Sequence, residues 1–403
     1  MKVQPWVRIS FINLLLVAAI GVTLRYKIVF SLPFIDQKHL LHGHSHFAFT
    51  GWVTQVLMAL MVQVVSEQKG ENMFGKYRLL LWLNLVSAYG MLLSFPVQGY
   101  GLVSISFSTL SILVSYIFAV WIWKDISRLP QKQVSQWWFK AAVVWNALSS
   151  IGAFSLAVMM ATKTVHQNWY LLAVYWFLHF QYNGWFLFTC MGLLFYQLHK
   201  AGMTNPVFNS IFRLFAIACV PTYFLSALWL HIPLWMDAIV VAAALMQVVA
   251  WGMFVKQIGT VKKVLLSAAD KLTAGLLLLS ALAFSIKLLL QLGSTIPTLS
   301  NLAFGFRPVV IGYLHLVLLG VITLFIIGYC FLSKIIIPGN MNIKGVLIFT
   351  GGVILNEALL MLQGVTSIGY TVVPYCNEAL LGAAIIMFTG LLFLNLQKTV
   401  LVK

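Results

Sequence analysis

The chain has 403 residues, of which 61% are hydrophobic and only 8% are charged, about a third of the charged fraction usual in soluble proteins. This composition excludes a soluble globular protein and a disordered one. Apolar runs of about 20 residues recur along the whole length and predict an all-α polytopic membrane protein with the lipid bilayer as its main partner. The net charge of +17 is explained by the positions of the basic residues and is not interpreted as a nucleic-acid signal.

The cysteines and the N-terminus exclude two further classes. The four cysteines stand singly, without a CxxC or CxxCH motif, so neither a zinc ribbon nor covalent c-type haem attachment is indicated. Lys2 and Arg8 precede the first apolar run without a small-residue cleavage site. This run is therefore interpreted as the first span and not as a signal peptide.

Hydropathy predicts twelve membrane spans, which make a single membrane domain over residues 1–403. No connection is long enough to fold as a domain of its own. The predicted spans are 9–29, 40–64, 78–96, 101–123, 138–161, 167–198, 208–230, 233–255, 264–291, 308–332, 344–363 and 378–397.

The basic residues predict the orientation of these spans. With the N-terminus, the even-to-odd connections and the C-terminus on one side, that side holds 19 of the 25 Lys and Arg residues and the other side holds 6. By the positive-inside rule both termini are expected in the cytoplasm, here of a bacterial inner membrane. The positive net charge is then explained by the orientation of the spans and by contact with anionic lipid.

One motif recurs within the second, sixth and tenth predicted spans. His46 is followed after five positions by Gly51, His179 by Gly184, and His315 by Gly320. The histidines are separated by 179 − 46 = 133 and 315 − 179 = 136 residues. Histidine is costly in hydrocarbon, and copies on every fourth span predict three pseudo-repeated four-helix arcs, at about 1–135, 136–262 and 263–403.

The repeated histidines suggest a haem site. Two imidazoles at one depth offer the axial nitrogens that a six-coordinate haem iron needs, and His46 and His315 are the candidate ligands of a haem b. His42 is the reserve candidate because it shares a helix face with His46, whereas His44 points the other way. The alternative is that these histidines only form hydrogen bonds within the bundle.

This arrangement resembles subunit I of the haem-copper oxidase superfamily, which includes the cytochrome oxidases and the bacterial nitric oxide reductases. The family has twelve spans in three four-helix arcs, with cofactors on spans 2, 6, 7 and 10. By this resemblance His46 and His315 match the two ligands of the low-spin haem. The stretch His179-Phe180-Gln181-Tyr182-Asn183-Gly184-Trp185 looks like the sixth-span motif of nitric oxide reductases, in which Glu-Gly follows a metal-binding histidine; Asn183 stands in place of that Glu. His179 would face copper, non-haem iron or a small ligand.

The sequence also departs from the family. Tyr313 stands where the tenth span of the family has the first histidine of His-x-His, and the predicted seventh span lacks the adjacent histidine pair. Tyr313 is either a haem ligand or a structural residue. These departures imply a one-haem relative that binds or senses a diatomic gas such as NO or O2, or transfers electrons from a donor, and is not a full terminal oxidase. Whether it is an enzyme stays open; if so, it is an oxidoreductase of this type.

Charged residues in apolar surroundings complete the candidates. Lys287 and Glu357 lie within predicted spans and are interpreted either as a proton path or as ion-pair partners, of one another for example. Arg307, just before the tenth span, is placed to meet a haem propionate or a lipid headgroup. Two other classes therefore stay open: a proton- or ion-coupled transporter that uses His179, Lys287 and Glu357, and an assembly factor without a cofactor.

Overall fold

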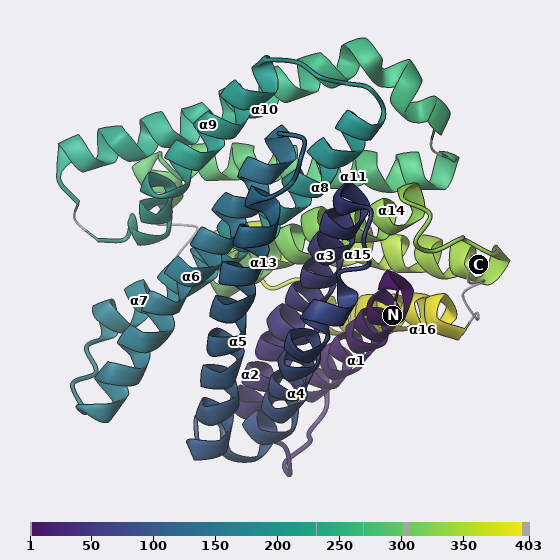
Figure 1. The fold of residues 1–403 in the computed structure, drawn as a ribbon. Coiled ribbons are helices and arrows are strands. Elements are labelled where there is room, and N and C mark those ends of the chain that lie inside the picture. Colours follow the sequence, from purple (N-terminus) through teal and green to yellow (C-terminus); the bar gives the residue numbers. More distant parts are fainter. Residues whose placement is uncertain (1, 231, 269, 301–305, 397–403) are drawn as a thin grey trace. The chain divides into compact units, whose positions relative to one another are not determined.

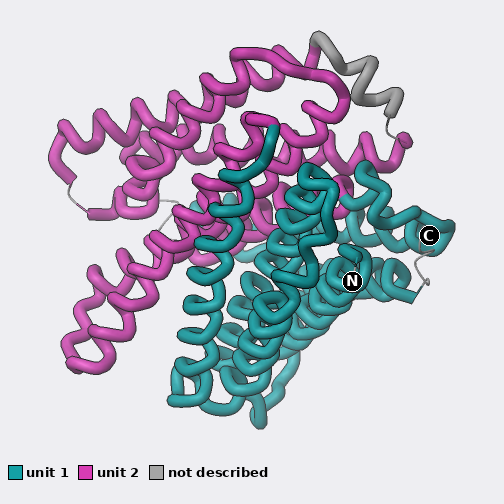
Figure 2. Tube along the Cα trace, viewed as in Figure 1, with its two compact units in different colours: residues 1–130, 330–403 teal, residues 131–329 magenta. Residues whose placement is uncertain are grey.

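The computed structural model describes residues 2–230, 232–268, 270–300 and 306–396, with the backbone alone for 260–268. All regular elements of these residues are helices. They form two compact units: unit 1 comprises residues 1–130 and 330–403, and unit 2 comprises residues 131–329 (Figure 2). The sequence predicted one membrane domain over the whole chain. The first division between the two units follows residue 130, five residues before the expected end of the first repeat at about 135 (135 − 130 = 5).

Unit 1 contains six helical segments from the first part of the chain and two from the last (Figure 1). They are α1 (Val3–Val29), α2 (Gln37–Phe47), η1 (Ala48–Thr54), α3 (Gln55–Lys69), α4 (Phe74–Gln98), α5 (Leu102–Ser127), α15 (Asn340–Ile368) and α16 (Cys376–Leu396). Helix α16 packs on both α15 and α1, so the two ends of the chain belong to one unit. Glycines allow the α15–α16 contact, because a Cβ on Gly345 would lie 2.6 Å from the carbonyl oxygen of Gly390.

Unit 2 is built from the middle of the chain. Its segments are α6 (Val134–Ala161), α7 (Gln167–His179), η2 (Phe180–Phe186), α8 (Leu187–Lys200), α9 (Val207–Cys219), η3 (Pro221–Ala227), α10 (Leu234–Ala268), α11 (Lys271–Gly293), α13 (Arg307–His315) and η4 (Leu316–Thr323). Helix α14 (Leu324–Leu332) continues η4 and contains the division between the units. The expected start of a span at 264 is wrong, because α10 continues to Ala268 and α11 begins at Lys271.

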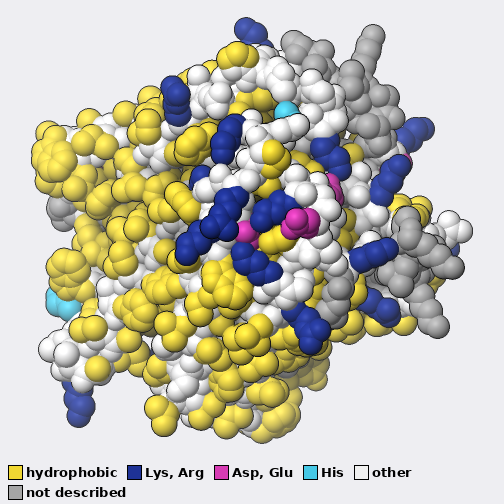
Figure 3. Space-filling view, in the orientation of Figure 1, with side chains coloured by type: hydrophobic (Ala, Val, Ile, Leu, Met, Phe, Trp, Pro, Cys, Tyr) yellow, Lys and Arg dark blue, Asp and Glu magenta, His cyan; other side chains and the backbone are white. Residues whose placement is uncertain are grey.

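The length and apolarity of these helices support a multi-pass membrane protein. Ten described helices are long and apolar enough to cross a membrane, or eleven if the bent pair α9–η3 counts as one span. Hydrophobic side chains also cover most of the surface visible in Figure 3, as expected for a surface that faces lipid.

The remaining predicted span, 167–198, is a helical run in the structure but does not belong to these ten or eleven. It consists of α7, η2 and α8, from Gln167 to Lys200. Polar His179, Gln181 and Asn183 lie in its middle, and they reduce its hydropathy relative to the other spans. The count of twelve apolar spans is therefore not reached by length and composition alone.

Candidate functional site

Each repeated histidine lies at the entrance to a π-helical turn. The π-helical segment η1 begins two residues after His46, whereas η2 begins directly after His179 and η4 directly after His315. Each segment contains the glycine of its motif, Gly51, Gly184 or Gly320. A π turn inserts a residue into the helix and leaves carbonyl groups without their usual partners, and such turns are frequent at functional sites. The motif read from the sequence thus marks a backbone feature as well as a histidine.

Each π turn contacts a polar residue on the long helix that precedes it in the chain. In unit 1 the Asn13 amide on α1 donates to the carbonyl oxygen of Gly51 at 2.6 Å. In unit 2 Gln181 donates to Asn146 on α6 at 2.9 Å, and Ser280 on α11 donates to the carbonyl oxygen of Val321 at 2.7 Å. The three helix residues are separated by 146 − 13 = 133 and 280 − 146 = 134 positions, nearly the spacing of the histidines. Sequence reasoning missed these residues, although their spacing was a usable signal.

The glycines of the turns meet different neighbours. A Cβ on Gly184 would lie 2.5 Å from the Cβ of Trp145 on α6, and one on Gly320 would lie 3.1 Å from the Cβ of Ala283 on α11. A Cβ on Gly51 would instead meet the ring of Phe47, 2.7 Å away on its own helix. In unit 2 the absent side chain therefore lets a second helix approach the π turn.

In unit 1, His46 lies in an aromatic setting at the end of α2. Its ring stacks on Phe95 with centroids 4.4 Å apart and planes 9° apart. Its Nε2 lies 3.2 Å from the hydroxyl of Tyr100, the polar partner found for this nitrogen. The ring is half-buried, and its Nε2 faces the hydroxyl of Tyr100.

The turn after α4 places Tyr100 beside His46. Gly99 has φ +58°, a conformation that favours glycine, and a Cβ at this position would lie 2.5 Å from Nε2 of His39. His42 shares the same face of α2: its ring lies 4.7 Å from that of Tyr100, and its Nε2 is buried without a hydrogen-bond partner. His44 faces α1, where its ring lies 3.5 Å from the Cβ position of Gly21. The two faces expected for these histidines are thus present.

In unit 2, both ring nitrogens of His179 are used by the protein. The side chain is 1% exposed, and Nε2 lies 2.8 Å from the carbonyl oxygen of Cys219, while Nδ1 lies 3.1 Å from the amide nitrogen of Asn183. A carbonyl can only accept, so Nε2 carries the proton and Nδ1 accepts from Asn183. The expectation that His179 faces copper, non-haem iron or a small ligand stays a prediction, and a metal on His179 would have to replace one of these two bonds.

The Cys219 carbonyl is available because α9 ends at this residue. The N–H group of Tyr223, four residues on, donates to the Val220 carbonyl at 3.1 Å and not to Cys219, and the chain bends by 43° into η3. In an apolar environment the freed carbonyl needs a donor, which His179 supplies; the Thr222 hydroxyl lies 3.2 Å away but is closer to the Ala218 carbonyl, at 2.8 Å. The hydrogen bonds of His179 therefore have a structural role.

Lys287 lies near this network on α11. It is 1% exposed, its Nζ has no hydrogen-bond partner, and the Phe284 ring lies 5.3 Å away. The ammonium group is close enough to interact electrostatically with His179 and Cys219. Three buried side-chain amide oxygens of unit 2 also lack hydrogen-bond partners, those of Asn183, Gln247 and Gln291. Unit 2 therefore contains a buried lysine that forms no ion pair with any described acid, together with unpartnered amide oxygens.

The other candidates of the tenth span lie on α13. The Nδ1 of His315 lies 2.8 Å from the carbonyl oxygen of Ile311, so Nδ1 carries the proton and the lone pair is on Nε2. Histidines that bind metals usually have this arrangement, because the outer hydrogen bond fixes the tautomer. The Tyr313 ring packs against Tyr182 with centroids 6.2 Å apart, and Arg307 is exposed in the first turn.

Glu357 belongs to unit 1 and therefore not to the unit of Lys287. It lies half-buried on α15 and accepts a hydrogen bond at 3.1 Å from the amide of Asn356. The proposed pairing of Glu357 with Lys287 stays a prediction, and so does a shared proton path.

Sequence reasoning missed one buried acid, Asp125 at the end of α5. It is 1% exposed and accepts from Lys69 at 3.1 Å, from Lys76 at 2.7 Å and from the hydroxyl of Tyr77 at 2.5 Å. Two cations and a hydroxyl compensate the desolvated carboxylate and tie the α3–α4 connection to α5. The signal in the sequence was the rarity of acids, since the whole chain has only 8.

These features define an all-helical, multi-pass membrane protein with histidine-marked π turns. Among the described residues, no three His, Cys, Asp or Glu side chains lie close enough together to hold a metal ion. A haem differs from such a site because it needs only one or two axial protein ligands. Comparison with protein-family models and with curated proteins finds no match to this sequence.

Proposed function

We propose that this chain is a haem b-binding protein of the haem-copper oxidase type, with His46 and His315 as the axial ligands. It would lie in a bacterial inner membrane with both termini in the cytoplasm. The departures at Tyr313 and in the seventh span favour binding or sensing of NO or O2, or electron transfer, over the work of a terminal oxidase. Bound haem would supply a redox-active iron that takes such ligands.

The tautomer of His315 is the observation that carries this proposal. Its Nδ1–H group donates to the Ile311 carbonyl, and this bond leaves the ligating lone pair on Nε2. His46 adds a second imidazole at the entrance of an equivalent π turn, with Nε2 directed to a single tyrosine hydroxyl.

The proposed architecture is three four-helix arcs. The near-equal spacing of Asn13, Asn146 and Ser280, together with that of the histidines, supports it, because two independent positions repeat in register. Arg307 precedes His315 by eight residues, about 12 Å along a helix, a reach that suits a propionate of a haem on His315.

A visible spectrum of the detergent-purified protein tests the proposal. We expect a Soret band that shifts on reduction, and its loss in both His46→Ala and His315→Ala. His166→Ala is the matched control, because His166 is exposed outside the repeated motif. A colourless protein after expression with added haem, or bands that survive both substitutions, would contradict the proposal.

A second candidate function is proton-coupled transport, and the buried Lys287 favours it. An intramembrane cation without a hydrogen-bond partner is a usual mark of an ion or proton pathway. Proton uptake into vesicles by a haem-free preparation, abolished in Lys287→Met and retained in His46→Ala, would favour transport over haem binding.

A further inference from the structure

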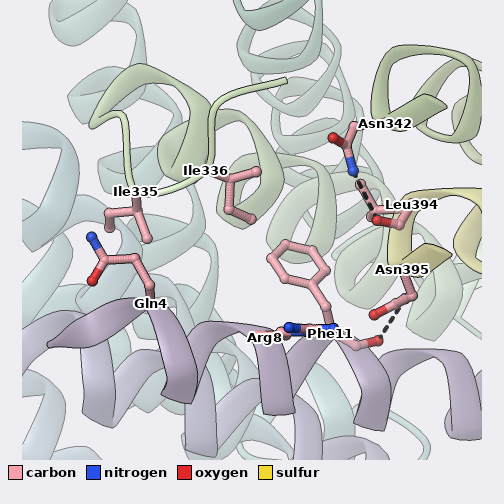
Figure 4. A pocket seen from close by; sticks show the side chains of 8 residues that line it. All are labelled: Gln4, Arg8, Phe11, Ile335, Ile336, Asn342, Leu394 and Asn395. Carbon is pink, nitrogen blue, oxygen red and sulfur yellow. Dashed lines mark hydrogen bonds between the residues drawn. The ribbon is translucent and has the colours of Figure 1, made fainter. Parts of the chain in front are cut away.

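Two asparagine amides line a cavity in unit 1, and neighbouring helices satisfy both. Asn342 donates to the carbonyl oxygen of Leu394 at 2.9 Å, and Asn395 donates to that of Phe11 at 3.2 Å (Figure 4). The cavity has room for about one water molecule. Several buried amide groups of unit 2 differ from these, because their oxygens have no donor.

Three of these oxygens belong to side chains on three elements of unit 2. The side chains are Asn183 on η2, Gln247 on α10 and Gln291 on α11, and each is at most 7% exposed. Each amide oxygen is buried and has no hydrogen-bond partner. A buried acceptor without a donor is costly, so a donor group is expected at these positions.

Lys287 is the buried cation of the same unit. Its Nζ has no hydrogen-bond partner, and an ammonium group carries three N–H donors, as many as there are unpartnered amide oxygens. Gln291 follows Lys287 by four residues and therefore lies on the same face of α11. The Phe284 ring, 5.3 Å from Nζ, adds a cation–π contact for an ammonium at this position.

Hydrogen bonds place the other two amides near the buried lysine. The Asn183 amide nitrogen donates to Nδ1 of His179 at 3.1 Å. The Gln247 amide nitrogen donates at 3.3 Å to the hydroxyl of Thr222, which lies 3.2 Å from the Cys219 carbonyl. The lysine interacts electrostatically with both His179 and Cys219. Each amide nitrogen therefore has an acceptor, whereas each amide oxygen still lacks a donor.

The acids of unit 2 do not compensate this lysine. Residues 131–329 contain two acids, Asp237 and Asp270. Asp270 caps the start of α11 through Thr273, and it precedes Lys287 by 287 − 270 = 17 residues, about 25 Å along the helix. Asp237 lies in the first turn of α10 and forms no ion pair with a described residue. The segment η4, which also packs against α11, has no titratable side chain.

We propose that this cluster is a binding site for a proton. The lone pair of the neutral Lys287 amine takes up the proton, and the oxygens of Asn183, Gln247 and Gln291 accept from the resulting ammonium, directly or through one bridging water. The positive charge of the lysine excludes an alkali cation, which would otherwise suit a set of amide oxygens. The role of the site rests on proton-coupled transport, the second candidate function above, with the proton as the coupled ion.

The charge state of Lys287 in the full-length protein tests the proposal. Nitrogen-15 NMR of detergent-purified protein with labelled lysine side chains follows each Nζ through a pH titration, and Lys287→Met identifies the signal. We expect Gln247→Leu and Gln291→Leu each to weaken proton binding about tenfold, because a bond made only by the ammonium is lost. Gln291→Glu should strengthen binding about tenfold or more, since it adds a negative charge one helical turn away.

Gln257→Leu is the matched control. Gln257 lies on the same helix as Gln247, but its amide oxygen already accepts from Asn205 at 2.9 Å, so this variant should change proton binding less than about twofold. The midpoint should also be the same in sodium, potassium and choline chloride at equal ionic strength. A midpoint that is equal in the wild type and both glutamine-to-leucine variants, or that shifts about tenfold with the alkali ion, would overturn the proposal.

Proton uptake into vesicles separates the site from the transport function. Uptake that is lost in Lys287→Met, together with shifted titrations in the glutamine variants, would support both. Shifted titrations in a protein without uptake would support the proton site and contradict transport. Uptake that persists while the titrations stay unshifted would assign transport to other residues and overturn the site.

Discussion

His46 in unit 1 and His179 in unit 2 start from the same local pattern and have different chemical surroundings. Both precede a π turn that contains the glycine five positions on. His179 is buried with both nitrogens bonded to the protein, whereas His46 is half-buried and directs Nε2 to one tyrosine hydroxyl. The shared motif therefore sets the backbone, and the neighbouring helices decide whether the imidazole is a structural donor or a candidate ligand.

The largest expected effect is the loss of stability on removal of the buried imidazole. His179→Ala leaves the Cys219 carbonyl and the Asn183 amide with one partner fewer and creates a cavity, so we expect the free energy of unfolding to fall by about 3 kcal/mol. His46→Ala in haem-free protein should cost less than about 1 kcal/mol. Denaturant titration of both variants in one detergent gives the difference, and equal costs would refute the contrast.

Asn183→Asp tests the hydrogen bond that the Asn183 amide donates to Nδ1 of His179. An ionised carboxylate cannot donate to Nδ1 of His179, so we expect a loss of about 2 kcal/mol in the free energy of unfolding. Asn209→Asp, on an exposed position of α9, is the control and should have little effect. Stability unchanged in Asn183→Asp would mean that the bond is unimportant.

The stability cost of replacing a glycine of a π turn with alanine should depend on which neighbour the new Cβ would meet. Gly184→Ala brings a Cβ against the Cβ of Trp145 and should cost about 2 kcal/mol, because two helices must move apart. Gly51→Ala meets the edge of the Phe47 ring on its own helix and not a second helix, so it should cost less. Thermal melting of the two variants measures this, and the reverse order would show that the two turns have other packing constraints.

A smaller effect is expected where a side chain caps a π turn. Ser280→Ala removes the bond to the Val321 carbonyl and should cost about 1 kcal/mol, with faster amide hydrogen exchange near residues 316–325. Ser294→Ala is the control, since its hydroxyl bonds a carbonyl of its own helix. Equal exchange in the two variants would remove the role assigned to Ser280.

The smallest effect concerns the start of the helix that carries His46. The backbone N–H of His39 donates to Asp36 at 2.8 Å and lowers the pKa of this exposed carboxyl below its usual 3.8. A lowered pKa stabilises the folded state above the unfolded pKa, and this contribution is lost as the pH falls through the folded value. We expect hydrogen exchange in the first turn of α2 to quicken only below about pH 4, and Asp36→Ala to remove that dependence. An identical pH profile in the variant would contradict the cap.

Much of the helical arrangement could be predicted from hydropathy, because each crossing must satisfy its own backbone in lipid. The run 167–198 was harder, since its polar residues, such as Gln181, are satisfied by partners on other helices. The π turns were not predicted, because a shift from α to π hydrogen bonding leaves the apolar pattern almost unchanged. Asp125 was missed because its compensating partners lie 48 to 56 positions away in sequence.

The sequence by itself determined the class of the protein, an apolar helical chain with a positive net charge, and it marked three histidines by their spacing. Composition and periodicity suffice for this because the bilayer acts on every span in the same way. Only the tertiary structure decided what each imidazole does. Hydrogen bonds such as those from His179 to Cys219 and from Asn183 to His179 depend on a helix break and on neighbouring helices, and no local pattern records those contacts.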